Sequence, residues 1–404
     1  MKHKLNIAIC ALFLCLLSGL GAAFWILPDK EFSEDENRAL QTLPSFSLSG
    51  WLDGTVTADF TDYCSDQFPL RRAMVGLRSL YDLALGRGES DGVLVGAGGQ
   101  QAVRLFDAWL SRTERANDTD YFSDAHIQAG VAALSGLQET LEAQGVPLYV
   151  LLAPRTVDVT LAAFDYPADQ SDRLISALNE GLTAAGVDPI DMTEEFRTRY
   201  AAGEYVYYRT DHHWTTGGAY LAYAAILEAM GKGSEVVPAE AFTVRQVPGF
   251  FGTTCSRSGV YFTDADTLEI WEAESDACYA VADGNGQELL RGFISESYLT
   301  GKDKYGAFLD GTHSVLTITQ VAPDSLSPAG EADGTARPRL LVARDSFAST
   351  VIPFLARHFD IVAVNLTGGM TDLSALAAAY DCDAVLVLCN LENVVTSDCI
   401  REIR

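Results

Sequence analysis

Residues 146–152 read Val-Pro-Leu-Tyr-Val-Leu-Leu, and this continuous apolar run decides the fold class. A strand of this length without polar alternation is typical of a sheet that helices cover on both faces. The run follows an amphipathic helical pattern at 124–144, which ends at Gly145. A second helix is predicted at 171–185, and a short strand follows at 187–190. This alternation predicts a mostly parallel, three-layered α/β domain.

Strands and helices alternate again near the C-terminus. The sequence predicts apolar strands at 340–343, 361–364 and 384–388, with helices between them at 347–358 and 372–380. Thr371 can cap the helix at 372–380. Closer to the N-terminus, helical spacing at 73–85 and a glycine-bounded strand at 92–96 precede this domain.

The composition changes between about residue 232 and residue 335, where Gly, Asp, Thr and Ser dominate. Short β-branched or aromatic segments at 260–263 and 315–319 predict a β-rich insertion in the α/β domain, with a surface loop at 325–337. The predicted domains are a membrane anchor or signal segment (1–28), a lead-in region packing on the core (29–90, irregular as far as residue 74) and the α/β domain (91–404).

The N-terminus indicates export. Lys2 and Lys4 precede an uncharged run at 5–27, which is long enough to span a bilayer from a cytoplasmic start. Residues 21–23 (Gly-Ala-Ala) resemble a cleavage site, so a cleaved signal peptide remains an alternative. Residues 24–27 continue the apolar run past that site, which favours an anchor. Both alternatives place the body of the protein outside the cytoplasm.

Charge restricts the partners. The chain has 404 residues, of which 55 are acidic and 28 basic, for a net charge of -27. Such a chain repels nucleic acid and anionic lipid, whereas a neutral or cationic glycan is electrostatically easier to bind. Six cysteines lie outside the apolar N-terminal run and none forms a CxxC pair, which argues against structural zinc. A Cys255–Cys278 disulfide and buried free thiols both remain open.

The run Thr-Asp-His-His-Trp at 210–214 is the strongest candidate site. It precedes a helix predicted at 216–230, which Thr215 or Thr216 can cap, and loops entering helices often carry catalytic side chains in open α/β sheets. Asp211 can accept a hydrogen bond from His213 and stabilise its imidazolium, as a general base requires.

Ser346 is the best candidate nucleophile. It follows an apolar strand through Arg344 and Asp345 and directly precedes a helix, whose unpaired N–H groups can stabilise an oxyanion. A simple helix cap is the alternative, and the presence of Asp211 and His213 favours the nucleophile.

A metal site is a weaker interpretation of the same run. Asp211, His212 and His213 could ligate zinc, but no HxxxH or HxxE spacing supports such a site, so no metal or other cofactor is predicted. His212 is expected to point away from His213, because neighbouring side chains diverge in an extended chain.

Several segments together resemble the DHHW protein family, which is related to the SGNH-hydrolase-like domains of alginate O-acetylation proteins (AlgJ/AlgX type). The central one is TDHHWT within YYRTDHHWTTGGAY at 207–220. SEDENRAL at 33–40 resembles the family opening SEEENRxL, and DQFPLR at 66–71 resembles its D-x-FPxR segment. RDSF at 344–347 and IPFL at 352–355 resemble its KDSYxxxxxPFL block.

This resemblance implies an SGNH-hydrolase-like fold and a Ser346–His213–Asp211 triad that transfers acetyl groups to a polysaccharide hydroxyl. It also implies a membrane-bound acyltransferase partner that supplies the acetyl group. Candidate substrate contacts are Trp214, Arg344 and Asn390, although Trp214 also fits a buried core and Asn390 a helix cap. Residues 365–367 depart from the family, which tends to carry an Asp and an Arg there.

Two other functions remain open. An esterase of the same fold would use water in place of the sugar hydroxyl, and a non-catalytic glycan-binding or assembly protein would keep the fold without turnover.

Overall fold

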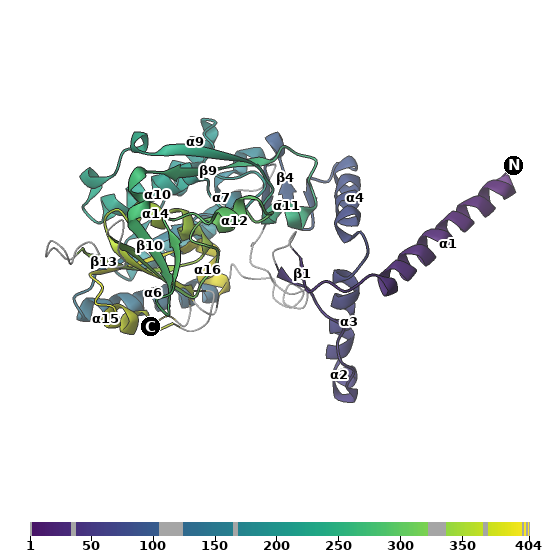
Figure 1. Ribbon diagram of the computed structural model, residues 1–404, viewed down its shortest axis with the longest axis horizontal. Helices are drawn as coiled ribbons and strands as arrows, with labels where there is room; N and C mark the ends of the chain where they lie inside the picture. Colours follow the sequence, from purple (N-terminus) through teal and green to yellow (C-terminus); the bar gives the residue numbers. More distant parts are fainter. Residues whose placement is uncertain are drawn as a thin grey trace. The chain divides into compact units, whose positions relative to one another are not determined.

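The computed structural model describes residues 2–33, 38–104, 124–164, 169–321, 337–366, 371–397, 400 and 403 (Figure 1). The chain divides into two compact units. Unit 1 comprises residues 1–91 and 255–262, and unit 2 comprises residues 92–254 and 263–404.

Unit 2 is built on an eight-stranded sheet in the order β11-β10-β12-β14-β13-β15-β6-β7. The strands are β6 (Leu148–Ala153), β7 (Pro189–Ile190), β10 (Tyr279–Asp283), β11 (Glu288–Arg291), β12 (Val315–Gln320), β13 (Arg339–Arg344), β14 (Asp360–Asn365) and β15 (Ala384–Asn390). Neighbours from β14 to β7 pair in parallel, and β12, β10 and β11 extend the sheet antiparallel. The predicted α/β fold with a mostly parallel sheet is confirmed.

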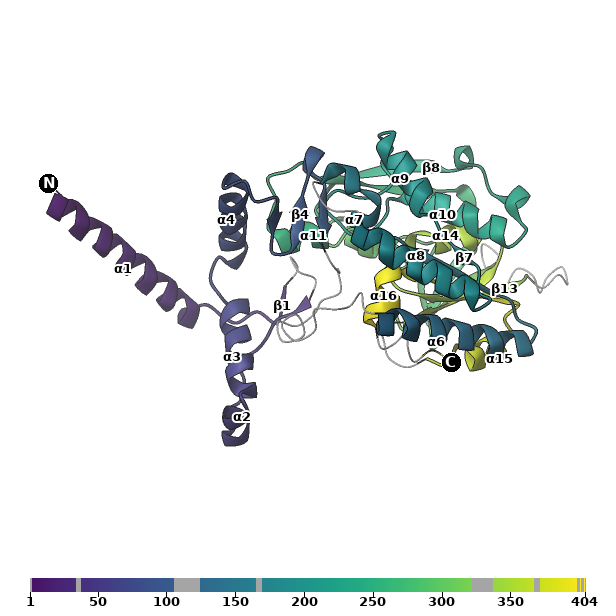
Figure 2. The same ribbon diagram turned by 180° about the vertical axis from the view of Figure 1, so that it is seen from behind.

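Alternating side chains of the buried strands enter two different cores. On β13, Leu341 and Ala343 pack with α6 (Asp124–Ala143), α8 (Asp169–Ala184), α15 (Leu373–Ala379) and α16 (Leu391–Thr396). Leu340 and Val342 pack with α9 (Thr193–Ala201) and α10 (Thr216–Ala229). Figures 1 and 2 show α6 and α15 on one side of the sheet and α9 and α10 on the other. Because both faces are buried, the strands are apolar along their whole length.

The helix predicted at 347–358 is two shorter pieces. Residues Ser346–Thr350 form the 3-10 turn η7, and Ile352–Leu355 form α14. Pro353 lies in the first turn of α14, where a backbone N–H needs no helical partner. In the middle of a continuous helix from η7, the same proline would leave a backbone hydrogen bond unmade. At the other predicted cap, Asp372 rather than Thr371 caps α15, because its side chain accepts a hydrogen bond from Ala375 N.

The β-rich insertion is only partly separate from the eight-stranded sheet, because the strands β10, β11 and β12 of the insertion belong to that sheet. Its other strands, β8 (Thr243–Phe250) and β9 (Asp266–Glu272), form an antiparallel ribbon. The strand predicted at 260–263 is wrong: this segment bends after Gly259, whose φ of 72° belongs to the left-handed region. Most of the loop predicted at 325–337 lies outside the described residues.

Shorter elements complete unit 2. They are β4 (Val93–Val95), which confirms the strand predicted at 92–96, its partner β5 (Gln101–Val103), α7 (Thr156–Val159) and α12 (Glu296–Leu299). α11 (Thr253–Ser258) begins at the end of unit 2 and runs into unit 1.

Unit 1 is more helical than predicted. Its elements are α1 (Lys2–Ile26), β1 (Phe32–Ser33), β2 (Arg38–Ala39), α2 (Leu48–Asp53), α3 (Thr55–Asp66), α4 (Arg71–Ala84) and β3 (Glu89–Ser90). The expectation of an irregular lead-in as far as residue 74 is therefore wrong. Ser47 caps α2 by accepting a hydrogen bond from Gly50 N, and Gly54, with a φ of 89°, separates α2 from α3. Within α1, Lys4–Ile26 is long and apolar enough to cross a membrane.

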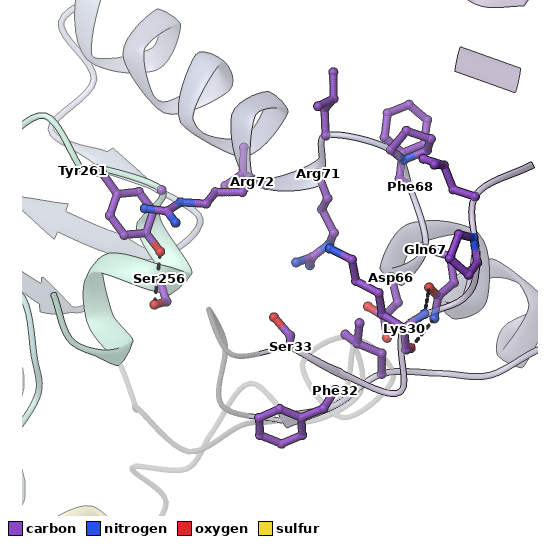
Figure 3. Close-up of a pocket in the computed structure, with 17 residues that line it drawn as sticks. Lys30, Phe32, Ser33, Asp66, Gln67, Phe68, Arg71, Arg72, Ser256 and Tyr261 are labelled. Carbon is purple, nitrogen blue, oxygen red and sulfur yellow. Dashed lines mark hydrogen bonds between the residues drawn. The ribbon is translucent and has the colours of Figure 1, made fainter. Parts of the chain in front are cut away.

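The DQFPLR segment at 66–71 fastens the chain that follows α1 (Figure 3). The Gln67 carboxamide accepts a hydrogen bond from Lys30 N and donates one to Lys30 O, both at 2.9 Å. Asp66 Oδ2 accepts a hydrogen bond from Gln41 N at 2.8 Å. Lys30, Asp66 and Gln67 line a cavity of about 370 Å³. Arg72 and Tyr261 line it too, and the Arg72 guanidinium carbon lies 4.1 Å from the Tyr261 ring centre. Residues 34–37 of the SEDENRAL segment lie outside the described residues.

The cysteines that the structure describes are free thiols, including Cys255 and Cys278. The Cys255 thiol is buried and donates a hydrogen bond to Val260 O at 3.2 Å. The disulfide alternative is therefore wrong for this structure, and the free-thiol alternative holds. Cys399 lies outside the described residues.

Candidate functional site

The TDHHW run forms a tight loop before α10. Tyr207 and Trp214 form an antiparallel bridge at its base, where Tyr208 N donates to His213 O at 3.2 Å. Thr215 caps α10 by accepting a hydrogen bond from Gly218 N at 3.2 Å, as predicted. Bridge and cap hold the intervening side chains in place.

Asp211 and His213 form a buried pair. Asp211 Oδ1 lies 2.6 Å from His213 Nδ1 and accepts a second hydrogen bond from His213 N at 3.0 Å. The other carboxylate oxygen accepts hydrogen bonds from Thr253 N at 2.9 Å and Thr253 Oγ1 at 3.1 Å. Burial alone would raise the pKa of Asp211, but His212, His213 and these hydrogen bonds hold it well below its usual value. Asp211 is therefore an ionised acceptor that orients the imidazole.

The second ring nitrogen of His213 reaches Ser346. His213 Nε2 lies 2.7 Å from Ser346 Oγ, within hydrogen-bond distance. Ser346 is exposed whereas His213 is 5% exposed, so the hydroxyl faces solvent while its partner is shielded. Segments far apart in sequence thus form one hydrogen-bonded chain from Asp211 through His213 to Ser346.

His212 does not point away from His213, which corrects the expectation from the sequence. The loop bends at this point, and the two ring centres lie 3.9 Å apart. His212 Nδ1 is 2.8 Å from Thr253 Oγ1. The ligand atoms of Asp211, His212 and His213 lie within 4.8 Å of one another, so the three residues could approach a metal ion. Binding through His213 would, however, displace either the carboxylate or the serine from its ring.

Asp345 links the turn that begins at Ser346 to the end of β15. Its side chain caps η7 by accepting a hydrogen bond from Phe347 N at 2.9 Å, and it also accepts one from Asn390 N at 2.6 Å. Burial raises the pKa of Asp345, and the two N–H donors oppose that rise. Asn390 caps α16 by accepting from Glu392 N at 2.9 Å. The capping alternative for Asn390 is therefore confirmed.

Arg344 is the last residue of β13 and is 1% exposed. Its Nη1 donates a hydrogen bond to Ser349 Oγ at 3.2 Å, whereas Nε and Nη2 have no partner among the described residues. Burial lowers the pKa of this guanidinium. Arg344 therefore has almost no surface to offer a substrate.

Trp214 is 0% exposed, so the buried-core alternative holds and no face of the indole is open to a sugar. Its indole Nε1 donates hydrogen bonds to Phe347 O at 3.1 Å and Thr350 Oγ1 at 3.0 Å. Because η7 begins with Ser346, these bonds tie the histidine loop to the segment that carries the serine.

Known proteins resemble parts of this chain. Residues 106–250 match the family described as SGNH hydrolase-like domain, acetyltransferase AlgX. This segment is therefore similar to that SGNH hydrolase-like domain. A probable alginate O-acetylase AlgJ of Pseudomonas fluorescens is 26% identical over 224 residues, which are 55% of this chain and 51% of that protein. The chain thus spans about half the length of the curated relatives it matches.

Solved structures share the SGNH-like fold of this chain. A DHHW family protein from Eubacterium siraeum superposes with a TM-score of 0.55 at 15% identity, covering 78% of this chain and 95% of that one. Bacillus cereus PatB1 with a sulfonyl adduct also gives 0.55, at 18% identity, covering 77% and 97%. The resemblance to DHHW and alginate O-acetylation proteins is confirmed. The matched segment 106–250 contains Asp211 and His213, and Ser346 follows it.

Sequence reasoning missed three residues that complete the candidate site. Thr253 holds Asp211, and Gly252 packs so closely that an added Cβ would lie 2.2 Å from Asp211 Oδ2. The ring of Tyr305 stacks on His213, with centres 3.8 Å apart and planes at 10°. All three lie in the β-rich insertion, which carried no motif; the glycine of the Phe-Phe-Gly-Thr-Thr stretch at 250–254 was the nearest local signal. Of the segment 365–367, Thr367 lies outside the described residues.

Proposed function

We propose that this protein transfers an acetyl group to a hydroxyl of a polysaccharide outside the cytoplasmic membrane, through an acetyl-Ser346 intermediate. The observation that carries the proposal is the continuous hydrogen-bonded chain from Asp211 through His213 to the exposed Ser346 hydroxyl. Such a chain provides a nucleophile, its base and the carboxylate that orients the base.

In the first half-reaction, Ser346 Oγ attacks the carbonyl carbon of an acetyl ester while His213 Nε2 takes the hydroxyl proton. The bond to the leaving group breaks, and the leaving oxygen departs with that proton. In the second half-reaction, a sugar hydroxyl gives its proton to His213 and attacks the acetyl carbon. Ser346 leaves as the alcohol when His213 returns the proton.

Charge develops on the imidazole and on the acetyl oxygen during each attack. Asp211 stabilises the imidazolium, since its depressed pKa keeps it ionised. Phe347 N–H is occupied by Asp345, whereas Ser346 N–H has no partner among the described residues. We assign Ser346 N–H to the oxyanion, because an N–H at the start of a helical turn favours negative charge.

The proposed location follows from α1. Lys4–Ile26 can cross a bilayer, and the two N-terminal lysines favour a cytoplasmic start, which leaves the SGNH hydrolase-like domain outside. No cytoplasmic acetyl donor reaches that side directly. A membrane-bound acyltransferase that passes acetyl groups outward is therefore the proposed partner, and the relatives named as alginate O-acetylases support a polysaccharide acceptor.

Hydrolysis is the second candidate reaction, because the Ser346 hydroxyl is exposed and water can reach the same acyl group. The two reactions separate when the full chain in detergent is mixed with an activated acetyl ester and neutral or cationic oligosaccharides. Acetylated sugar supports transfer, and acetate alone supports the esterase.

Ser346→Ala tests the site itself, with Ser234→Ala as the control, since Ser234 is also an exposed serine. Loss of ester turnover in the first variant and its retention in the second support the proposal. Unchanged ester turnover in Ser346→Ala would overturn the proposed acetyl-Ser346 intermediate. It would favour a protein in which the Asp211–His213–Ser346 site has no catalytic role.

A further inference from the structure

Tyr305, from the β-rich insertion, contacts both the imidazole of His213 and the backbone of Ser346. Its ring lies parallel to His213 at 3.8 Å, and its hydroxyl donates a hydrogen bond to Ser346 O at 3.1 Å. The hydroxyl also lies 3.4 Å from Thr350 Oγ1. Tyr305 belongs to η6 (Tyr305–Ala307), between β11 and β12.

We propose that Tyr305 is a positioning residue that stabilises the protonated form of His213 through its ring and fixes the Ser346 backbone through its hydroxyl. This inference rests on the proposed function, because it assigns Tyr305 a task in the proton transfer between Ser346 and His213.

The ring argument follows from geometry. A cation over the face of a tyrosine is attracted by the negative charge of that face, and the attraction grows when water is excluded. Tyr305 is 7% exposed and His213 5%, so the stack is largely dry. The attraction exists only when the imidazole is protonated, which is the state that forms as the Ser346 proton is taken. The stack therefore stabilises the transition state more than the resting state.

The hydroxyl argument concerns the nucleophile. Burial raises the pKa of Tyr305 well above its usual value, so the hydroxyl stays protonated and can donate to the Ser346 carbonyl. Ser346 is exposed at the start of η7, and exposed residues at the ends of short turns are held by few contacts. This bond fixes the peptide that carries the nucleophilic oxygen.

Other charged or titratable groups surround the stacked pair, and a test must leave them unchanged. Asp211 and His212 contact the imidazole from its own loop. Asp345 and Arg344, at the end of β13, act electrostatically on Tyr305. Changing only the ring at position 305 meets this condition.

The experiment measures sulfonylation of Ser346 by a sulfonyl fluoride in the full chain, followed by mass spectrometry as a function of pH. Ser346 Oγ forms the bond to sulfur, fluoride leaves, and His213 accepts the proton. The pH at which the rate reaches half its plateau reports the titration of His213. No acetyl donor or glycan has to be known.

Two variants separate the effect of the ring from that of the hydroxyl. The first is Tyr305→Phe, which lacks the hydroxyl, and the second carries a trifluorinated phenylalanine at position 305. The two rings have nearly the same shape, but fluorination removes the negative charge of the face. We expect Tyr305→Phe to keep the midpoint and lower the plateau rate several-fold. We expect the fluorinated ring to shift the midpoint downward by roughly 0.5 to 1.5 pH units.

Identical midpoints for the two rings would overturn the stabilisation of the imidazolium, and an unchanged plateau in Tyr305→Phe would overturn the role of the hydroxyl. A residue that only fills the core would change thermal stability without moving the midpoint. If the unaltered chain is not sulfonylated at Ser346, the proposed function itself fails. If it is sulfonylated and both variants behave like it, only the Tyr305 proposal fails.

Discussion

Gly252→Ala should disable the site by steric pressure on a single carboxylate. A Cβ at this position would lie 2.2 Å from both Asp211 Cβ and Asp211 Oδ2, whereas non-bonded carbon atoms rest at about 3.5 to 4.0 Å. Relief requires a displacement of roughly 1 Å or more. Asp211 cannot move freely, because His213 holds one carboxylate oxygen and Thr253 the other.

The expected loss follows from that displacement. Misplacing a catalytic group by about 1 Å can cost a rate factor on the order of 100, and overpacking a buried site costs about 1 to 3 kcal/mol of stability. We expect Gly252→Ala to slow sulfonylation of Ser346 by about that factor and to lower the midpoint of thermal unfolding by several degrees.

Gly217→Ala is the matched control. Gly217 lies in the first turn of α10, a few residues after His213, and the nearest atom to an added Cβ is Thr215 Oγ1 at an ordinary 3.7 Å. This variant should react like the unaltered chain and be slightly more stable, since alanine favours a helix. Equal rates and equal stability for Gly252→Ala and Gly217→Ala would refute the close packing on Asp211.

Three further predictions concern the same residues. Asp211 has a pKa held below its ordinary value of 3.8, so it stabilises the fold above that pH and loses this effect as the pH falls toward its folded-state pKa. The difference in free energy of unfolding between the unaltered chain and Asp211→Asn should therefore shrink as the pH falls below about 4 in denaturant titrations. Dialysis against EDTA should leave the sulfonylation rate unchanged, and a loss restored by zinc would instead assign a metal to Asp211, His212 and His213. Trp214→Phe removes an indole donor from two buried acceptors and should cost about 1 to 3 kcal/mol; calorimetry showing no loss would refute this role.

The sheet was predictable because its strands are buried on both faces. The apolar run at 146–152 contains most of β6, and the run at 384–388 lies within β15, so length and apolar character were sufficient evidence. The lead-in was less predictable, because α2 and α3 are short helices that carry polar residues. The start of α2 is decided by a single cap, Ser47. Pro353 divided a helix that apolar spacing alone had predicted as continuous.

The site was predictable where its chemistry is local. Asp211 and His213 stand two residues apart, and Ser346 follows the end of a strand, so residue type and spacing suggested each of them. The direction of His212 depended on a bend that no residue in the run requires, and its expected direction was wrong. Thr253 and Tyr305 could not be found in this way, because they meet His213 and Asp211 only after the insertion has folded onto the loop.

The central claim is that Ser346 carries the acetyl group. The most direct measurement is a brief exposure of the full chain to an activated acetyl ester, acid quenching, and peptide mass spectrometry, with His213→Ala as the control that lacks the base. We predict an acetyl group on the peptide containing Ser346 in the unaltered chain and its absence in His213→Ala. Continued turnover of the ester without acetyl on Ser346, or equal acetylation in both proteins, would contradict the account.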